Sequence, residues 1–258
     1  MNVLVVGAGA MGRWFGESIH CDLAFADADP AVAENAANEL GGRAVELDTS
    51  ETFDAVCLAV PLPVVEGAIE EHAVKAERAL LDLTGVMAEP VSAMAERVPD
   101  KERVSLHPLF GPENAPGNVA VVVDEPGPVT DDLLSALESR GNTLVETTPD
   151  EHDEAMKTVQ ASAHTAILAF ALSANSVPDG LRTPVYDCLT DLSAQVTSGD
   201  SRVYADIQAA FDGAEDVAAA ANELADATVE EFEHLYRDAK SNGDTNAYRN
   251  ETDPEGKR

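Results

Sequence analysis

Basic residues are scarce in this chain of 258 residues, and their scarcity excludes one class of partner. Sixteen lysines and arginines stand against 48 aspartates and glutamates, which gives a formal net charge of −32 at pH 7. Binding to a nucleic-acid backbone requires basic patches, because lysine and arginine neutralise the phosphates. The sequence has no such patch, so we predict that nucleic acid is not a partner.

Long apolar runs are missing too, and cysteine is rare. No apolar stretch approaches the ~20 residues of a membrane-spanning helix, and residues 1–6 read as a strand rather than as part of a signal peptide. The three cysteines, Cys21, Cys57 and Cys188, are odd in number and far apart, which predicts reduced thiols. We therefore expect a cytoplasmic protein with no membrane partner and no metal site.

The acidic residues are spread along the whole chain rather than collected in one tail or patch. Dispersed carboxylates, only five lysines and many alanines and valines resemble the cytosolic proteins of halophiles. Molar salt shortens the Debye length to ~3 Å and removes the self-repulsion; an acidic binding surface is the alternative. The halophile interpretation predicts a lower melting temperature in dilute buffer than in molar potassium chloride.

What the chain does have is an apolar strand at its start that runs into a glycine-rich turn. Residues 1–6 are followed by Gly7, Gly9 and Gly12 at G-x-G-x-x-G spacing. Glycines at this spacing permit a tight turn, let the backbone approach a pyrophosphate, and pack the next helix on the strand. Plain strand-to-helix connections also use this spacing, so the context has to decide.

The context is a second apolar run, residues 21–26, which ends in Asp27. The separation is close to the ~20 residues at which an acidic side chain meets the adenosine ribose hydroxyls. Strand, turn, helix, strand and acid in this order predict a dinucleotide site. Asp27 and Asp29 place negative charge, and no arginine, where a 2′-phosphate would lie, which favours NAD over NADP. The expected cofactor contacts in this region are Gly7, Gly9, Ala10, Met11, Gly12 and Asp27.

Apolar runs alternate with helical patterns over residues 1–148, which predicts an α/β domain with a doubly wound parallel sheet, the Rossmann arrangement. Further strands are expected at 43–47, 54–60, 79–84, 103–106, 118–124 and 143–146. Pro61 stops the run at 54–60, at a carboxyl strand end where ligands bind in such sheets. Val60 and Pro61 are therefore expected to border the cofactor. A proline-capped strand end without a ligand is the alternative.

The strand at 103–106 leads into the segment His107-Pro-Leu-Phe-Gly-Pro112. Two prolines and a glycine exclude regular structure and predict a rigid loop at the end of a strand. Histidine titrates near neutrality, so His107 is able to take a hydroxyl proton as hydride leaves the same carbon. A structural histidine, hydrogen-bonded beside the proline, is the interpretation left open.

The sequence changes character near Pro149, where alanine-rich helices replace strands. Helices are expected at 150–174, 184–196, 201–211 and 214–239, and the last has the near-heptad apolar stripe of a core or dimer seam. These helices predict an all-helical domain at 149–240, followed by a polar, frayed tail at 241–258. His152 and His164 lie ~120° apart on one helix. From its alanine neighbours alone, His164 is more readily a core histidine than a substrate donor.

Five segments form one set: the turn at 7–12, the loop at 107–112, Glu151-His152-Asp153, and residues 160–164 and 204–208. Together they resemble the prephenate dehydrogenase family of tyrosine biosynthesis. The resemblance implies oxidation of prephenate by NAD⁺ with loss of carbon dioxide, giving 4-hydroxyphenylpyruvate and NADH. It implies that His107 accepts the ring-hydroxyl proton and that His164 donates a hydrogen bond to the substrate. It also implies a homodimer formed by the helical domain.

The chain departs from the family pattern at two points. The family commonly carries Ser-x-Lys after the fifth strand, with the serine in the site, where this chain has Thr84-Gly85-Val86-Met87. Because Gly85 has no hydroxyl, Thr84 is the expected replacement. The family's arginine for a substrate carboxylate is also missing near Gln195, which leaves Arg182 and Arg202 as candidates.

Two other functions stay open at this point. An arogenate dehydrogenase differs only in an amino group that replaces a keto group of the substrate, and no residue here decides between them. A non-catalytic NAD-sensing module is the alternative from another class. Such a module would be expected to lack the loop histidine, whereas His107 is present.

Overall fold

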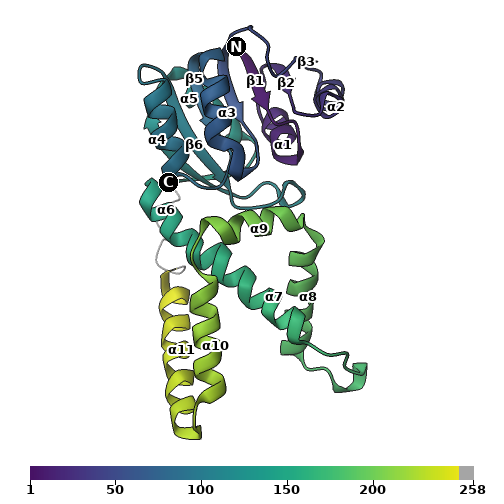
Figure 1. Cartoon of the computed structure of the whole chain (residues 1–258), viewed down its shortest axis with the longest axis vertical. Coiled ribbons are helices and arrows are strands. Elements are labelled where there is room, and N and C mark those ends of the chain that lie inside the picture. The colour runs from purple at the N-terminus through teal and green to yellow at the C-terminus, as the bar shows by residue number, and fades with distance from the viewer. Residues whose placement is uncertain (250–258) are drawn as a thin grey trace. The chain divides into compact units, whose positions relative to one another are not determined.

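The computed structural model describes the backbone of residues 1–249 and the side chains up to residue 242. The chain forms two compact units, whose elements are labelled in Figure 1. The sheet unit comprises Met1–Val159 and Gly199–Phe211, and the helical unit comprises Gln160–Ser198 and the chain from Asp212 onward. The sequence-based boundary near residue 148 therefore differs from the division by contacts, which falls at residue 159.

The sheet unit is built on one eight-stranded sheet with the order β3-β2-β1-β4-β5-β6-β7-β8. Neighbouring strands are parallel except β6 and β7, which are antiparallel. The predicted doubly wound α/β fold is confirmed, with one antiparallel pair added. The strands are β1 (Asn2–Val6), β2 (Asp22–Ala26), β3 (Arg43–Ala44), β4 (Phe53–Leu58), β5 (Ala76–Asp82), β6 (Glu102–Pro108), β7 (Asn118–Glu125) and β8 (Thr143–Glu146).

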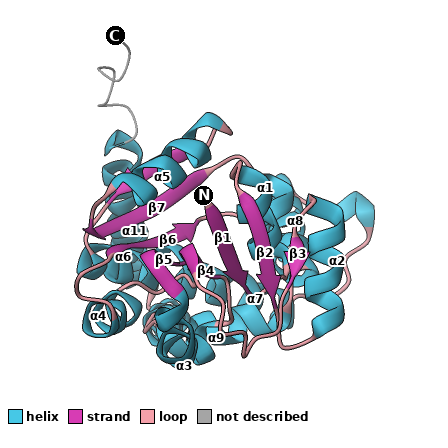
Figure 2. Cartoon of the chain, turned by 90° about the horizontal axis from the view of Figure 1, so that it is seen from above, coloured by secondary structure: helices cyan, strands magenta, loops and turns pink. Residues whose placement is uncertain are grey.

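Helices cover both faces of the sheet, as Figure 2 shows. Val3 and Val5 of β1 join a core cluster with α1, α2 and α5, whereas Leu4 and Val6 face a second cluster with α3 and α4. Alternate side chains of a strand point to opposite faces, so an unbroken apolar run fits a strand that is buried on both sides. The helices are α1 (Ala10–Ser18), α2 (Pro30–Leu40), α3 (Val65–His72), α4 (Ala88–Arg97), α5 (Pro128–Ser139), α6 (Pro149–Met156) and α9 (Ser201–Ala210), with the 3₁₀ turns η1 (Leu62–Val64), η2 (Ala73–Lys75) and η3 (Pro112–Asn114).

The segment expected to form one helix over 150–174 is interrupted. After α6, a π-helical segment, η4 (Lys157–Ser162), precedes α7 (Ala163–Ser173). A π-helical turn holds more residues than an α-helical one, so the predicted 120° between His152 and His164 is wrong, since it assumed an unbroken α-helix. The other elements of the helical unit are η5 (Asp179–Leu181), α8 (Pro184–Ser198), α10 (Ala214–Asp226) and α11 (Val229–Arg249).

The helix expected at 214–239 is in fact two helices, α10 and α11. Thr228 and Glu231 form a reciprocal cap, because the Thr228 amide and hydroxyl donate to the Glu231 carboxylate while Thr228 Oγ1 accepts from the Glu231 amide. This cap starts a new helix and divides the predicted seam. The helix then continues to Arg249, past the expected end near 240, and the rest of the predicted tail lies outside the described residues. Among the helices described up to Arg249, none combines the length and the apolar character that a membrane-spanning helix requires.

Candidate active site

The carboxyl ends of the parallel strands β1, β2, β4, β5 and β6 lie at one edge of the sheet. Most of the residues predicted to contact a cofactor or to carry chemistry follow these ends directly. The loop after β6 also returns to α1, because the Phe110 ring contacts the Trp14 ring with centroids 5.5 Å apart. The glycine turn and the segment after His107 therefore both border α1.

The three glycines of the first turn differ in what they allow. Gly7 has φ +92°, and a β-carbon there would overlap the Ala59 carbonyl oxygen; one at Gly12 would overlap the Gly7 carbonyl oxygen. A β-carbon at Gly9 would meet no described atom within 4 Å. Gly7 and Gly12 thus serve the tight packing of strand, turn and helix, whereas Gly9 leaves space beside the turn.

The start of α1 is suited to phosphate groups. Gly9 is its N-cap residue and offers no side-chain acceptor. The amides of Ala10, Met11 and Gly12 belong to the first helical turn, where an α-helix has no acceptor of its own for them. Such amides, together with the helix dipole, favour an anion. The open space at Gly9 and these donors fit a pyrophosphate.

Asp27 follows β2 and is held by the backbone of two turns. Its Oδ2 accepts from the Ala8 amide at 2.8 Å, and its Oδ1 accepts from the Asp29 amide at 2.9 Å. The residue lines a cavity of about 520 Å³ together with residues from α2 and the segment after β3. Each carboxylate oxygen keeps a second lone pair for a ribose hydroxyl.

Val60 and Pro61 follow β4 beside the glycine turn. The Val60 amide nitrogen would lie 3.3 Å from a β-carbon at Gly7, so this residue borders the turn directly. Pro61 is exposed and precedes η1. Both residues therefore lie at the end of β4 beside the glycine turn, and their contact with a cofactor stays a prediction.

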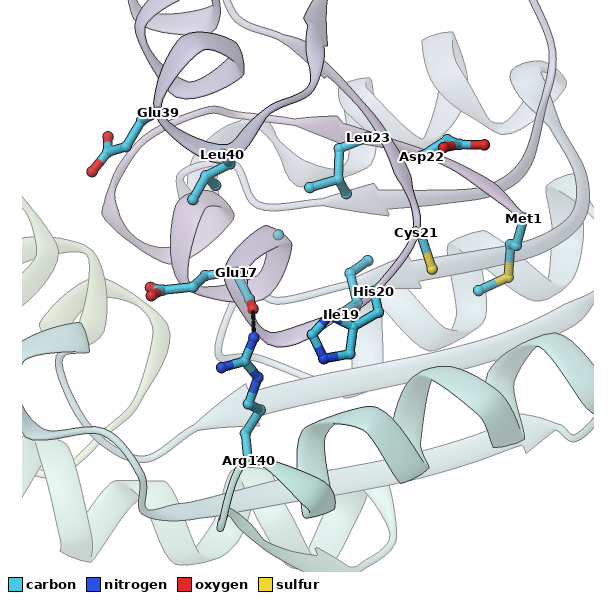
Figure 3. Close-up of a pocket in the computed structure, with 11 residues that line it drawn as sticks. Met1, Glu17, Ile19, His20, Cys21, Asp22, Leu23, Glu39, Leu40 and Arg140 are labelled. Carbon is cyan, nitrogen blue, oxygen red and sulfur yellow. Dashed lines mark hydrogen bonds between the residues drawn. The ribbon is translucent and has the colours of Figure 1, made fainter.

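A larger cavity of about 580 Å³ lies at the opposite, amino-terminal edge of the sheet (Figure 3). It is lined by Met1, His20 and Cys21 among others, and the Arg140 guanidinium donates to the Glu17 carbonyl oxygen at 2.6 Å beside it. None of the predicted site residues lines this cavity. The chemistry of the carboxyl edge, rather than cavity size, therefore locates the candidate site.

His107 lies within β6, where it pairs with Ala120 of β7. The prediction that it belongs to a loop is wrong by two residues, because β6 extends to Pro108 when β7 pairs with it. The side chain is buried, and its Nδ1 lies 2.8 Å from Nε2 of His152. Burial, reinforced by His152 and opposed by Asp153, lowers the pKa of His107 to about 3. The ring is therefore neutral at pH 7 and able to accept a proton.

His152 and Asp153 stand at the centre of a hydrogen-bonded chain that the sequence patterns did not predict. His152 Nδ1 lies 2.8 Å from Asp153 Oδ1. Asp153 also accepts from the amides of Met87 at 3.1 Å and Ala88 at 3.0 Å, at the start of α4. Burial raises the pKa of Asp153, but the hydrogen bonds from His152, Ala88 and Met87 outweigh it and lower that pKa. The Glu-His-Asp triplet was visible in the sequence, but its contact with His107, 45 residues away, was not.

The segment after β5 places Thr84 and Gly85 differently. Thr84 Oγ1 donates to Asp82 Oδ1 at 2.8 Å. Gly85 has φ +90°, and a β-carbon there would lie 3.1 Å from His107 Nε2. Position 85, where the family commonly carries serine, is thus the one that faces His107, whereas Thr84 turns toward Asp82. Asp82 itself is fully buried, and burial raises its pKa to about 6 against the lowering effect of the nearby Ser105 and Thr84 side chains.

The predicted substrate contacts fall in both units. His164 lies on α7 of the helical unit, where burial lowers its pKa. Arg182, also in the helical unit, donates from Nε to Asp187 Oδ1 at 2.6 Å. Arg202 lies on α9 of the sheet unit, and within the described residues its guanidinium forms no ion pair.

Comparison with known proteins adds sequence relationships to this geometry. Residues 18–122 match the family model described as prephenate dehydrogenase, nucleotide-binding domain. The 4-amino-4-deoxyprephenate dehydrogenase of Streptomyces pristinaespiralis is 33% identical over 232 residues, covering 82% of this chain and 78% of that protein. The T-protein of Haemophilus influenzae is 29% identical over 165 residues, covering 60% of this chain and 44% of that protein.

Solved structures share the fold over nearly the whole chain. Aquifex aeolicus prephenate dehydrogenase, in complex with hydroxyphenyl propionate and NAD⁺, has a TM-score of 0.72 at 18% identity and 98% coverage of both chains. Synechocystis arogenate dehydrogenase has a TM-score of 0.61 at 19% identity, and the match covers 96% of this chain and 100% of that chain. The solved structures show a shared fold, and the sequence matches to the nucleotide-binding domain and to the Streptomyces relative at 33% identity show common family membership. The chain belongs to the prephenate dehydrogenase family.

Proposed function

We propose that the protein is an NAD-dependent dehydrogenase that oxidatively decarboxylates prephenate to 4-hydroxyphenylpyruvate. The observation that carries the proposal is the neutral, buried His107 at the carboxyl edge of the sheet. Its Nε2 faces Gly85, which has no side chain, in the segment after β5. A neutral imidazole in this place suits a proton acceptor for the substrate's ring hydroxyl. Family membership supports this class of reaction.

The residues of the first turn fit the cofactor. The amides of Ala10, Met11 and Gly12 would hold the pyrophosphate, with Gly9 leaving room for it and Gly7 permitting the tight turn, and Asp27 would accept from the adenosine ribose. Val60 and Pro61 would border the nicotinamide half. When bound, NAD⁺ supplies the acceptor for the hydride.

A single side chain of the protein, His107, is able both to accept the proton of the substrate's ring hydroxyl and to return it. His107 accepts the proton of the ring hydroxyl at Nε2 as the carbon that bears the hydroxyl loses hydride. The resulting dienone loses carbon dioxide, and the electrons of that bond make the ring aromatic. His107 then returns the same proton to the phenolate oxygen, so the reaction has no net proton uptake or release. A neutral resting state for His107 is required for the first step.

Recognition of the two substrate carboxylates requires specific cations, because the surrounding chain is strongly acidic. Arg202 is the better candidate, since Arg182 already pairs with Asp187 and lies 3.7 Å from Asp179. We propose His164 as a further donor to the substrate. Thr84 stays a candidate for the role of the family serine, although its hydroxyl donates to Asp82.

We further propose that the protein acts in the cytoplasm as a homodimer joined by the helical unit. Several large apolar side chains on those helices are exposed, among them Leu172 at 89%, Val185 at 71% and Tyr236 at 66%. Exposed apolar surface of this kind is typical of protein–protein contacts.

A second candidate substrate is 4-amino-4-deoxyprephenate, in which an amino group replaces the ring hydroxyl. The Streptomyces relative at 33% identity is named as the dehydrogenase of that compound. This chain has Gly85 where the family commonly carries a serine, so no hydroxyl at position 85 faces His107, and the polar surroundings of the substituent differ accordingly. Arogenate is a third candidate, and a non-catalytic NAD-sensing module remains the alternative outside enzymes.

The deciding experiment supplies prephenate, 4-amino-4-deoxyprephenate and arogenate in turn with NAD⁺ in molar potassium chloride and follows NADH formation. We expect prephenate to give the highest kcat/KM. His107→Asn should lower kcat by roughly 10²–10⁴-fold while the dissociation constant of NAD stays unchanged. Undiminished turnover by this variant would remove His107 from the mechanism. NAD binding without oxidation of any of the three compounds would favour the sensing module.

A further inference from the structure

We propose that His152 and Asp153 are positioning residues that fix the tautomer of His107, so that Nε2 is its proton-accepting atom. The proposal rests on the proposed function, since it concerns the base of that reaction. It assigns a role to two buried or partly buried groups that the proton path described above does not use. All the contacts involved lie within the sheet unit.

The fixed end of the chain of hydrogen bonds is the Asp153 carboxylate. Its Oδ1 accepts from the Met87 amide and its Oδ2 from the Ala88 amide. These amides open α4, which has no side-chain cap of its own at Met87. Asp153, from α6, thus caps a neighbouring helix, and the helix dipole favours its negative charge. The carboxylate is held in place by backbone and cannot easily turn.

The direction of each hydrogen bond follows from this anchor. An ionised carboxylate only accepts, so His152 Nδ1 must donate across its 2.8 Å contact with Asp153 Oδ1. In a neutral His152, Nε2 then carries the lone pair and accepts. The 2.8 Å contact with His107 therefore has Nδ1–H of His107 as donor. A neutral His107 protonated at Nδ1 carries its lone pair on Nε2.

The opposite direction requires an imidazolium at His152 and places the hydrogen on His107 Nε2. Both rings are almost fully buried, with 3% of His152 and 8% of His107 exposed. An additional buried charge costs free energy that a neutral pair avoids. The neutral arrangement with a basic Nε2 is therefore favoured.

The two nitrogens of the His107 ring have different neighbours among the contacts described above. A β-carbon at residue 85 would lie 3.1 Å from Nε2, and glycine has no side chain at this position. The Nδ1 side has a connected path through His152 to Asp153 and the start of α4. When Nε2 takes up a proton, the same path places the Asp153 charge where it stabilises the imidazolium.

Asp153→Asn tests the anchor. An asparagine at this position has two possible orientations. In the first, its NH₂ group faces the Ala88 amide, so that two hydrogen-bond donors oppose each other. In the second, its NH₂ group faces Met87 and His152, so that His152 Nδ1 must accept and His152 is protonated at Nε2. The second arrangement reverses the His107 tautomer. We expect kcat to fall by about 10–100-fold, by analogy with carboxylates that orient metal-binding histidines through a hydrogen bond, while KM and the dissociation constant of NAD stay unchanged.

His152→Gln and His152→Leu test the middle of the path. The glutamine amide oxygen is able to accept from His107 Nδ1–H, so this variant should keep more of the wild-type kcat than the leucine variant. His72→Gln is the matched control, because His72 is also 3% exposed in the sheet unit but lies on α3, where it contacts Lys75. We expect the control to leave kcat unchanged.

Nitrogen-15 NMR of labelled histidine reads the tautomer without any turnover. In the wild type at pH 7, His107 should be protonated at Nδ1 and not at Nε2, and Asp153→Asn should reverse or mix the two forms. A wild-type spectrum with the hydrogen on Nε2 overturns the proposal, as does a wild-type kcat in both Asp153→Asn and His152→Leu. If no substrate is oxidised, the proposed function fails, but the spectrum still decides the tautomer.

Discussion

The sheet unit and the helical unit differ most in how much apolar surface they bury. In the sheet unit, the side chains of both sheet faces form two clusters with many members at 0% exposure. In the described part of the helical unit, Ala161 and Val196 are the buried apolar side chains, while Leu172 and Val229 are 89% and 80% exposed. Burial of apolar surface is the main favourable term in folding. The sheet unit therefore has an extensive core of its own, whereas the helical unit leaves several large apolar side chains exposed.

The largest expected effect separates the two units by one matched pair of substitutions. Leu81→Ala, at 0% exposure in the sheet core, should lower the free energy of unfolding by about 2–5 kcal/mol. Leu172→Ala, on an exposed helix face, should change the folding of the chain by about 0.5 kcal/mol or less but weaken self-association. Urea unfolding and analytical ultracentrifugation, both in molar potassium chloride, measure the two effects. Equal losses of unfolding free energy in the two variants would contradict the inferred difference in apolar burial between the two units.

A smaller effect is expected from pH, and it should be confined to the sheet unit. The Asp82 carboxyl has an ordinary pKa of 3.8, which burial raises to about 6 in the fold. The protonated form therefore stabilises the fold, fully below about pH 4, and this stability is lost as the pH rises through about 6. The difference is at most about 3 kcal/mol.

Asp82→Asn should remove this pH dependence between pH 4 and 7 and make the protein more stable than the wild type at neutral pH. Asp216→Asn, at an exposed site on α10, removes the same charge and is the control. Unfolding free energies of the three proteins at several pH values measure the slopes. A slope that survives in Asp82→Asn assigns the titration to another group.

The smallest effect concerns helix caps, one in each unit. Thr148 Oγ1 accepts from the Glu151 amide at the start of α6, and Thr228 forms the reciprocal cap of α11. Alanine at either position should cost about 1 kcal/mol of unfolding free energy. Thr148→Ala should in addition lower kcat slightly, because α6 carries His152 and Asp153, whereas Thr228→Ala should not. Thermal melts and initial rates distinguish the two variants, and an equal loss of kcat would contradict the assignment.

The sequence was most informative where a single local rule decides the structure. Alternating apolar runs predicted every strand of the sheet, and the glycine spacing predicted the first turn. The missed break at Thr228 had a local signal as well, the Thr-x-x-Glu of a capping box, which the longer apolar stripe obscured. The π-helical segment η4 had no such signal in its alanine-rich surroundings.

The contacts of His107 depend on tertiary structure and were beyond any local rule. Its pairing with β7 extended β6 by two residues past the predicted end. Its partner His152 comes from α6, after two further strands and a helix. Patterns of spacing identify which residue types are present, but not which of them meet across the fold.

The hydrogen bond from the Ala8 amide to Asp27 has a consequence for cofactor preference. The carboxylate that would reject a 2′-phosphate is the same group that holds the second residue of the glycine turn. A substitution at Asp27 that admits NADP therefore also removes an acceptor from the phosphate-binding turn. At this position, exchange of one dinucleotide for the other and the shape of the turn change together, so a second compensating residue is needed for a clean switch.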